Sequence, residues 1–159
     1  MLNTITVLLT DFNIASLTLL EFEPNSDNEE AGLVARQNDK HHYETGVTLR
    51  QNKRWIFLRK ALKGKTIEPT KYLDIQLGPV ILSVKSSPLS YEFYCTSSTG
   101  AQESLGTALT KVLSVEEIGF DDGICFTGVY FGRYTTDNGK KCTTPADFDC
   151  FEYSTEEGL

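Results

Sequence analysis

The sequence predicts an all-β domain of antiparallel strands, either a β-sandwich of two sheets or a barrel. Short segments that alternate apolar and polar residues follow one another along the chain, and turn-forming residues separate them at intervals of roughly 8–12 residues. No repeat of 20–50 residues is present, which argues against a propeller or a solenoid. With 159 residues the chain is long enough to bury a core of its own, so we expect a single domain over residues 1–159.

Seven segments before residue 100 have the composition and alternation of strands. In each of them side chains of one face are mostly apolar, and Gly, Pro, Asn, Asp or Ser clusters bound the segment. We expect these strands at residues 12–23, 31–37, 42–49, 55–59, after 64–65, 80–85 and 91–95.

Residues 103–118 are the one segment where a helix competes with a strand. Leu105, Leu109 and Val112 approach helical spacing, whereas Gly106 and the β-branched residues weaken a helix. We therefore expect a short helical turn or an irregular loop here.

The closing segment, residues 126–153, predicts two strands joined by a turn at Asp137-Asn138-Gly139. On its first strand Thr127, Val129, Phe131 and Arg133 fall on one face, and Gly128, Tyr130, Gly132 and Tyr134 fall on the other. Glycine beside large aromatic residues leaves room for a neighbouring backbone or for a ligand.

Composition restricts the partners of the domain. The formal net charge is −7 and the pI is about 4.8, so we expect no nucleic acid and no anionic membrane surface among its partners. A mean hydropathy of −0.25 and the lack of a long apolar run argue against a spanning helix. Residues 1–12 have no basic segment of the kind that begins a signal peptide, which leaves the localisation open and favours the cytoplasm.

Two blocks of sequence carry a resemblance to a known family. The first is FTGVYFGRY, DNGK and PADFDCFEY within residues 126–153, and the second is LLEFEP with DNEEAGLVARQNDKHHYE within residues 19–44. In this order they resemble the C-terminal β-sandwich domain of family 43 glycoside hydrolases, the β-xylosidases and arabinofuranosidases. The resemblance implies a concanavalin-A-like jelly roll, an accessory domain that accompanies a catalytic β-propeller and in some relatives binds xylan.

The same resemblance bears on activity and on partners. The sequence has no counterpart of the catalytic propeller, so we expect no enzyme activity from it. In the family the domain also begins well before the equivalent of Met1, which would leave one sheet edge unpaired. A homodimer or a partner catalytic domain is the expected cover for such an edge.

Candidate carbohydrate-binding residues come from both lines of reasoning. The RQND and HHY blocks match the family at Arg36, Asn38 and His42, which we expect to line a polar groove, and the Phe of FTG, Phe126, matches an aromatic that the family's sandwich lends to the propeller's active site. From the residues themselves, Tyr130 and Tyr134 lie on the glycine-bearing face. Trp55 is a further candidate, although its position after a turn favours half-buried packing.

Metal ligands are less well supported. His41 and His42 are adjacent on a strand and point to opposite faces, so they cannot chelate one ion together, whereas His42 and Glu44 share a face. Asp147 and Asp149 project in parallel from one strand and cannot flank a sugar as a catalytic pair.

A structural Ca²⁺ is the remaining candidate for the two aspartates. It would use Asp147, Asp149 and Glu21, with Glu23 as the alternative to Glu21, if the strand at 12–23 pairs with the last strand. No other cofactor is expected.

Four cysteines are present, and none forms a CxxC pair, so a zinc site is not expected. Cys95 and Cys150 lie in strand-like runs, which favours buried thiols over a disulfide framework in a domain of this size.

We therefore expect a non-catalytic, carbohydrate-associated module that binds a xylan-type or other β-linked saccharide weakly on a concave face. The alternative is a stand-alone sandwich that works by dimerisation or by docking another protein. Whether Tyr130, His42 and Arg36 converge on one open concave face, or are buried, distinguishes the two interpretations.

Overall fold

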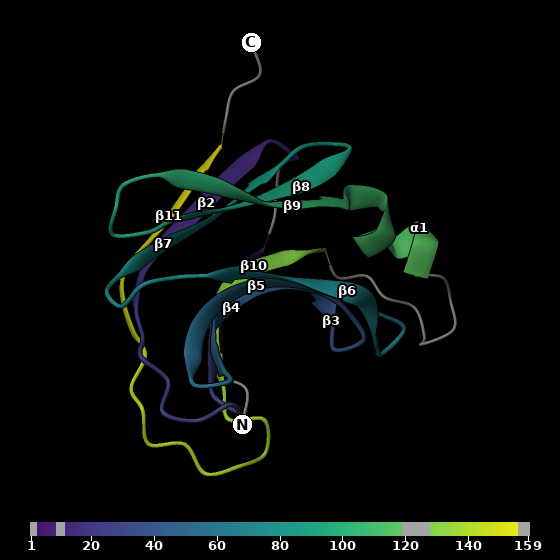
Figure 1. Cartoon of the computed structure of the whole chain (residues 1–159). Coiled ribbons are helices and arrows are strands. Elements are labelled where there is room, and N and C mark those ends of the chain that lie inside the picture. Colours follow the sequence, from purple (N-terminus) through teal and green to yellow (C-terminus); the bar gives the residue numbers. More distant parts are fainter. Residues whose placement is uncertain (1–2, 9–11, 119–127, 156–159) are drawn as a thin grey trace.

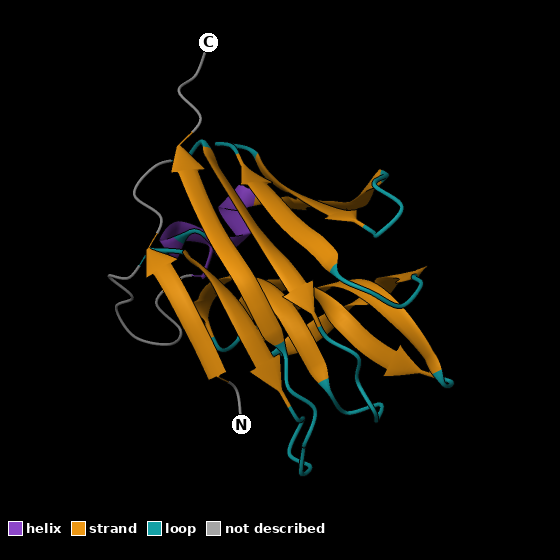
Figure 2. Ribbon diagram, turned by 90° about the vertical axis from the view of Figure 1, so that its left-hand side faces the viewer, coloured by secondary structure: helices purple, strands orange, loops and turns teal. Residues whose placement is uncertain are grey.

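The computed structural model describes residues 3–8, 12–118 and 128–155. Two antiparallel sheets lie on top of each other in two layers, and a short helical segment sits at one side (Figures 1 and 2). This arrangement confirms the predicted β-sandwich. No helix in the described part of the chain is long and apolar enough to cross a membrane.

Six strands form the first sheet of the described residues, which we call sheet A. In spatial order they are β1 (Asn3–Leu8), β10 (Tyr130–Thr136), β3 (Glu30–Asn38), β4 (His41–Arg50), β5 (Lys53–Leu62) and β6 (Lys65–Asp74). Five strands form sheet B, in the order β11 (Asp147–Thr155), β2 (Ile14–Glu21), β7 (Val80–Ser86), β8 (Ser90–Thr96) and β9 (Gln102–Leu109). The last two strands therefore return beside early ones, β10 between β1 and β3 in sheet A and β11 beside β2 in sheet B.

The core lies between the two sheets. Alternate residues of β2, β7 and β8 are buried, as the sequence pattern predicts for strands with one face on the core. A chain of aromatic rings joins the layers: Tyr43 of sheet A meets Tyr91 and Phe93 of sheet B edge-on, and Tyr91 meets Phe131, with ring centroids 5.7–6.4 Å apart. Such pairs add about 0.5–1.5 kcal/mol each beyond the area they bury.

The short helical turn or irregular loop predicted at 103–118 is found only in its second half. Gln102–Leu109 forms strand β9 rather than a helical turn or a loop, and only the residues after it are helical, as a 3₁₀ turn (Thr110–Leu113) and α1 (Val115–Ile118). The register shifts between Phe93 and Tyr94 of β8, opposite Gly106 and Ser104, and Gly106 has a φ of +133°. This bulge disturbs the alternation on which strand prediction depends, so the spacing of Leu105 and Leu109 resembled that of a helix.

The chain also contains a strand near its N-terminus that the sequence did not predict. Asn3–Leu8, for which the sequence analysis only argued against a signal peptide, forms β1 and pairs with β10 along its whole length. The strand predicted to start at Phe126 begins at Tyr130; Phe126 and Thr127 lie outside the described residues.

The cysteines of the described residues are free thiols. Cys95 is buried, as predicted, and Cys142 and Cys150 are half-buried. Burial raises the pKa of the Cys95 thiol to about 11, with a smaller contribution from the nearby Glu103 carboxylate. Cys125 lies outside the described residues.

Candidate functional site

Sheet A curves around the face that it turns away from sheet B, which we call the concave face (Figure 1). On this face Tyr130, Arg36 and His42 form one row across three neighbouring strands, because Tyr130 pairs with Arg36 and Arg36 pairs with His42. Side chains directly opposite each other in antiparallel strands lie on the same face, about 4.5–5.5 Å apart at their Cβ atoms. All three are half-buried, so the row is accessible.

Asn38 was predicted to line a polar groove with Arg36 and His42, and its side chain forms hydrogen bonds within the hairpin between β3 and β4. Its side-chain oxygen accepts hydrogen bonds from the backbone N–H groups of Lys40 and His41, each at 2.9 Å, and lies 3.1 Å from the Nδ1 of His41. Asn38 therefore stabilises the hairpin between β3 and β4, two residues beyond Arg36. Arg36 itself forms an ion pair with the exposed Asp39 of that hairpin.

A cluster of charged residues lies beside this row, towards the middle of the concave face. The Arg59 guanidinium bridges two carboxylates: it donates to both oxygens of Glu30, at 2.6 and 3.1 Å, and to Glu44, at 2.9 Å from Nε. His42 Nε2 lies 2.9 Å from the other oxygen of Glu44, which confirms that His42 and Glu44 share a face. We call Glu30, His42, Glu44 and Arg59 the Arg59 cluster.

The Arg59 cluster lowers the pKa of Glu44 although this carboxylate is largely buried. Burial raises the pKa of Glu44, but the hydrogen bond from His42 and the positive charge of Arg59 outweigh it, so the pKa ends below its ordinary value. Burial lowers the pKa of Arg59, and its bonds to Glu30 and Glu44 outweigh that effect and raise it. His42 and Arg59 together therefore favour the charged form of Glu44.

Tyr134 lies on the concave face, as predicted, but it is buried, with 1% of its surface exposed. Its strand neighbours are Gly32 of β3 and, one strand further, Gly46 of β4. A Cβ on Gly46 would stand 3.0 Å from the Tyr134 hydroxyl, so the side chain extends across these two glycines. The prediction of a groove residue is therefore wrong for Tyr134: the space beside it is filled by neighbouring backbone.

The Tyr134 hydroxyl is buried without a hydrogen-bond partner among the described residues. Burial, together with the nearby Glu44 and Glu30 carboxylates, raises its pKa well above the ordinary value. It therefore stays protonated beside the Arg59 cluster.

Trp55 occupies the far end of the same face. It is half-buried on β5, its indole N–H donates to the Arg50 carbonyl at 3.2 Å, and it meets Tyr72 edge-on. Trp55 lies in the same cross-strand row as Glu30. Glu30 and Arg36 are six residues apart along β3, which is a distance of about 20 Å. Trp55 is thus separate from the Tyr130 row, and its packing on Tyr72 agrees with the half-buried role that its position favours. Phe126 lies outside the described residues.

The predicted metal ligands come only partly together. β11 pairs with β2 and sets Asp147 opposite Glu21, as the sequence suggested. Asp149 falls at a bulge between Phe148 and Cys150 and pairs with no β2 residue. All three carboxylates are exposed, and the described residues contain no group of three or more His, Cys, Asp or Glu side chains placed to hold a metal ion.

Three residues of the Arg59 cluster escaped the sequence analysis in whole or in part. Glu44 was linked only to His42 by the two-residue spacing, and Arg59 and Glu30 were not linked at all. They meet because β3, β4 and β5 are adjacent in sheet A with a register that sets Glu44 opposite Arg59. No local signal predicts that register.

The sequence matches, over residues 2–154, the family model described as the β-xylosidase C-terminal concanavalin A-like domain. The chain belongs to this family. The match confirms both the predicted resemblance to family 43 glycoside hydrolases and the concanavalin-A-like class of the sandwich.

Individual relatives are family 43 enzymes. The chain is 39% identical over 142 residues to the non-reducing end α-L-arabinofuranosidase BoGH43B of Bacteroides ovatus, a match that covers 89% of this chain and 26% of the enzyme. The structure of the B. ovatus xyloglucan-locus GH43B covers 92% of this chain and 28% of its own, with 37% identity and a TM-score of 0.85. The structure of BlXynB from Bacillus licheniformis shares the fold with a TM-score of 0.87 at 21% identity, over 97% of this chain and 30% of that chain.

The chain spans about a quarter of the length of the curated relatives it matches. What it shares with them is the C-terminal concanavalin A-like domain. The enzymatic activity of those relatives is a property of the whole proteins.

Proposed function

We propose that this domain is a non-catalytic carbohydrate-associated module that binds a xylan-type or other β-linked saccharide weakly along the concave face of sheet A. The observation that carries the proposal is the row of Tyr130, Arg36 and His42, three half-buried side chains of three adjacent strands on one curved, open face. An aromatic ring packs against the C–H face of a sugar, and Arg and His groups beside it bond to the hydroxyls.

The neighbouring Arg59 cluster supports binding rather than hydrolysis. A glycosidase needs one carboxylic acid with a raised pKa, whereas the pKa of Glu44 lies below its ordinary value. Arg59 bridges both Glu30 and Glu44 and so fixes the two carboxylates. Side chains held in this way are rigid supports for His42. The His42 side chain therefore loses less conformational entropy when a ligand binds.

The length of the face favours an oligosaccharide over a single sugar unit. From the Tyr130 row to Trp55 the face extends about 20 Å along β3 and β4, and it carries polar groups between two aromatic ends. The B. ovatus relative is described as an α-L-arabinofuranosidase, and a Butyrivibrio fibrisolvens relative, 25% identical over 132 residues, as a xylosidase/arabinosidase. These descriptions suggest pentose polymers as first ligands.

The test is calorimetric titration of the domain with xylo- and arabino-oligosaccharides, with and without Ca²⁺. We expect dissociation constants in the micromolar-to-millimolar range and loss of measurable binding in Tyr130→Ala. Tyr94→Ala is the matched control, because Tyr94 is also a half-buried tyrosine, on β8 in sheet B. The comparison with and without Ca²⁺ tests the expected structural ion.

Two results would overturn the proposal. One is the absence of heat with every saccharide from a protein that unfolds cooperatively. The other is an equal effect of Tyr94→Ala and Tyr130→Ala. The domain would then be treated as an interaction module, and its oligomeric state and protein partners would be measured next.

A further inference from the structure

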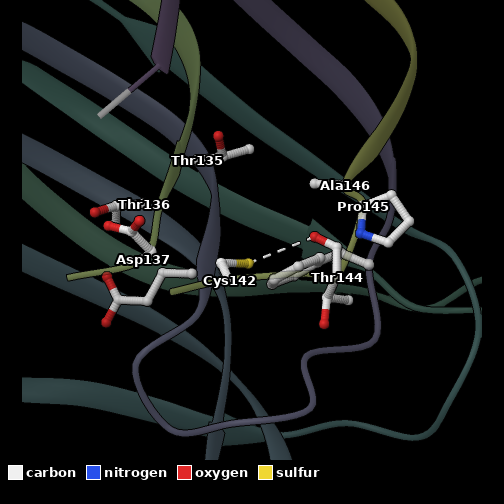
Figure 3. A pocket seen from close by; sticks show the side chains of 9 residues that line it. Thr135, Thr136, Asp137, Cys142, Thr144, Pro145 and Ala146 are labelled. Atoms are coloured by element: carbon white, nitrogen blue, oxygen red, sulfur yellow. Dashed lines mark hydrogen bonds between the residues drawn. The ribbon is translucent and has the colours of Figure 1, made fainter. Parts of the chain in front are cut away.

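A polar pocket of about 360 Å³ opens at one end of the sandwich, away from the Tyr130 row. Figure 3 shows Thr135, Thr136 and Asp137, where β10 ends, facing the segment that leads through Thr144 and Pro145 into β11. Phe22, which follows β2, and Glu30, which begins β3, complete the wall. The pocket thus lies where both sheets contribute.

Hydrogen bonds between distant parts of the chain hold this pocket open. The Asn28 side chain donates to the Asp137 carbonyl at 3.0 Å, and the Asn138 side chain donates back to the Asn28 carbonyl at 2.7 Å. Across the opening, the Asn25 side chain donates to the Thr144 hydroxyl at 3.0 Å. Both sides of the pocket are therefore tied to residues 25–28, and a preformed pocket binds a ligand without paying for loop ordering.

The pocket lining offers hydrogen-bond donors, hydrogen-bond acceptors and an apolar surface. Thr136 Oγ1 already accepts from the backbone N–H of Asn138 at 3.1 Å, so its own proton remains to be donated. The Thr135 hydroxyl makes no hydrogen bond within the described residues. Glu30, with 8% of its surface exposed, receives two bonds from Arg59 and has further lone pairs as an acceptor.

The apolar part of the lining comes from Phe22 and Pro145. Hydroxyl groups that donate, a fixed carboxylate that accepts and an apolar wall together suit a compact ligand with hydroxyls on its edge and C–H groups on its face. The volume equals about a dozen water molecules at about 30 Å³ each, close to the lower limit of typical ligand pockets.

We propose that this end pocket binds one neutral, hydroxyl-rich ring of the size of a single sugar unit. The pocket is separate from the Tyr130 row, because Thr136 lies six residues beyond Tyr130, or about 20 Å along β10. Glu30 and Asp137 are among the residues that line the pocket, and their negative charges disfavour an anionic sugar of the same size.

The test is an NMR titration of the ¹⁵N-labelled domain with D-xylose and with L-arabinose, with D-glucuronate as the anionic comparison. We expect saturable shifts of the backbone amides of Thr135, Thr136, Asp137 and Thr144, and at least fivefold weaker binding of D-glucuronate. Thr135→Val removes one hydroxyl at nearly constant shape and should weaken binding at least fivefold. Ala146→Leu should abolish binding, because a longer side chain at that lining residue occupies the space of the ring.

The matched control is Thr107→Val, which removes a threonine hydroxyl from an exposed position of β9 and should leave the binding unchanged. The proposal is overturned if these amides show no saturable shift, if Ala146→Leu binds like the wild type, or if Thr107→Val weakens binding as much as Thr135→Val. The amides of Arg36, His42 and Tyr130 report the concave face in the same spectra. Failure of one site is thereby distinguished from failure of the other.

Discussion

Replacement of Arg59 by methionine should be among the most destabilising single changes on the concave face. Arg59 is the one cation that contacts both Glu30 and Glu44 in the described structure. The exposed fractions of the three side chains are 24%, 9% and 13%. Methionine fills much of the same space without the charge, so the variant leaves two largely buried carboxylates without their shared cation.

Removal of one partner from a buried ion pair costs about 3–5 kcal/mol. Since a quarter of the Arg59 side chain is exposed and water can reach the cluster, we expect the lower end, about 3 kcal/mol. Domains of this size have unfolding free energies of about 5–15 kcal/mol, so the loss is a large fraction of the total. Urea unfolding followed by tryptophan fluorescence measures it directly, because Trp55 is the single tryptophan of the chain.

The loss should also depend on pH in a defined direction. In the wild type the pKa of Glu44 is lowered in the folded state, so its contribution is complete above the ordinary value of 4.5 and is lost as the pH falls through the lower, folded pKa. In the variant, burial is no longer opposed by Arg59, and Glu44 takes up a proton more readily. The difference between the two proteins should therefore be largest near pH 7 and shrink as the pH falls towards and below 4.5.

The control variant is Arg50→Met. Arg50 is exposed and its guanidinium lies 4.0 Å from the centre of the Tyr72 ring, an interaction of about 0.5–1 kcal/mol. An Arg59→Met variant that loses no more stability than Arg50→Met would refute the reasoning. So would a loss of equal size at pH 7 and pH 4.

Three further outcomes follow from the packing. In Gly46→Ala the new Cβ would stand 2.6 Å from the Ala31 carbonyl oxygen, so urea unfolding should show a loss of about 3 kcal/mol or more; a loss below about 1 kcal/mol would contradict the close approach. Tyr134→Phe removes a buried hydroxyl that has no partner among the described residues and should leave stability unchanged or raise it by about 1 kcal/mol, and a clear loss would reveal an unseen hydrogen bond. Cys95, whose pKa is raised to about 11, should react with a thiol reagent at pH 8 more slowly than Cys150, as peptide mapping by mass spectrometry would detect.

The sequence was sufficient for the fold class because alternation of apolar and polar residues survives wherever a strand has one face on the core. It predicted β2, β3, β4, β7 and β8 close to their observed bounds. It failed at β9, where a bulge at Gly106 shifts the register and breaks the alternation. Helical spacing and bulged-strand spacing are similar over so few residues.

The candidate site shows the same division between local and long-range information. A two-residue spacing along β4 was enough to pair His42 with Glu44, which the structure confirms at 2.9 Å. The same kind of local pattern suggested an open groove beside Tyr134, and this was wrong because the free space belongs to Gly32 and Gly46 on other strands. Which residues become neighbours across a sheet depends on register and strand order, and neither is present in a local pattern.

On the concave face, the free energy of unfolding should depend mainly on the largely buried side chains, and ligand binding on the accessible ones. The two effects can therefore be measured separately. The Arg59 cluster is largely buried and saturated with internal contacts, so its loss should be measured chiefly as unfolding free energy. Tyr130 and Arg36 are half-buried, and Arg36 is paired with the exposed Asp39, so their replacement should change binding more than folding. His42 belongs to both groups, since its Nε2 bonds to Glu44 while its ring stands in the Tyr130 row. A saccharide bound to that row would therefore contact a side chain whose position the buried network already fixes.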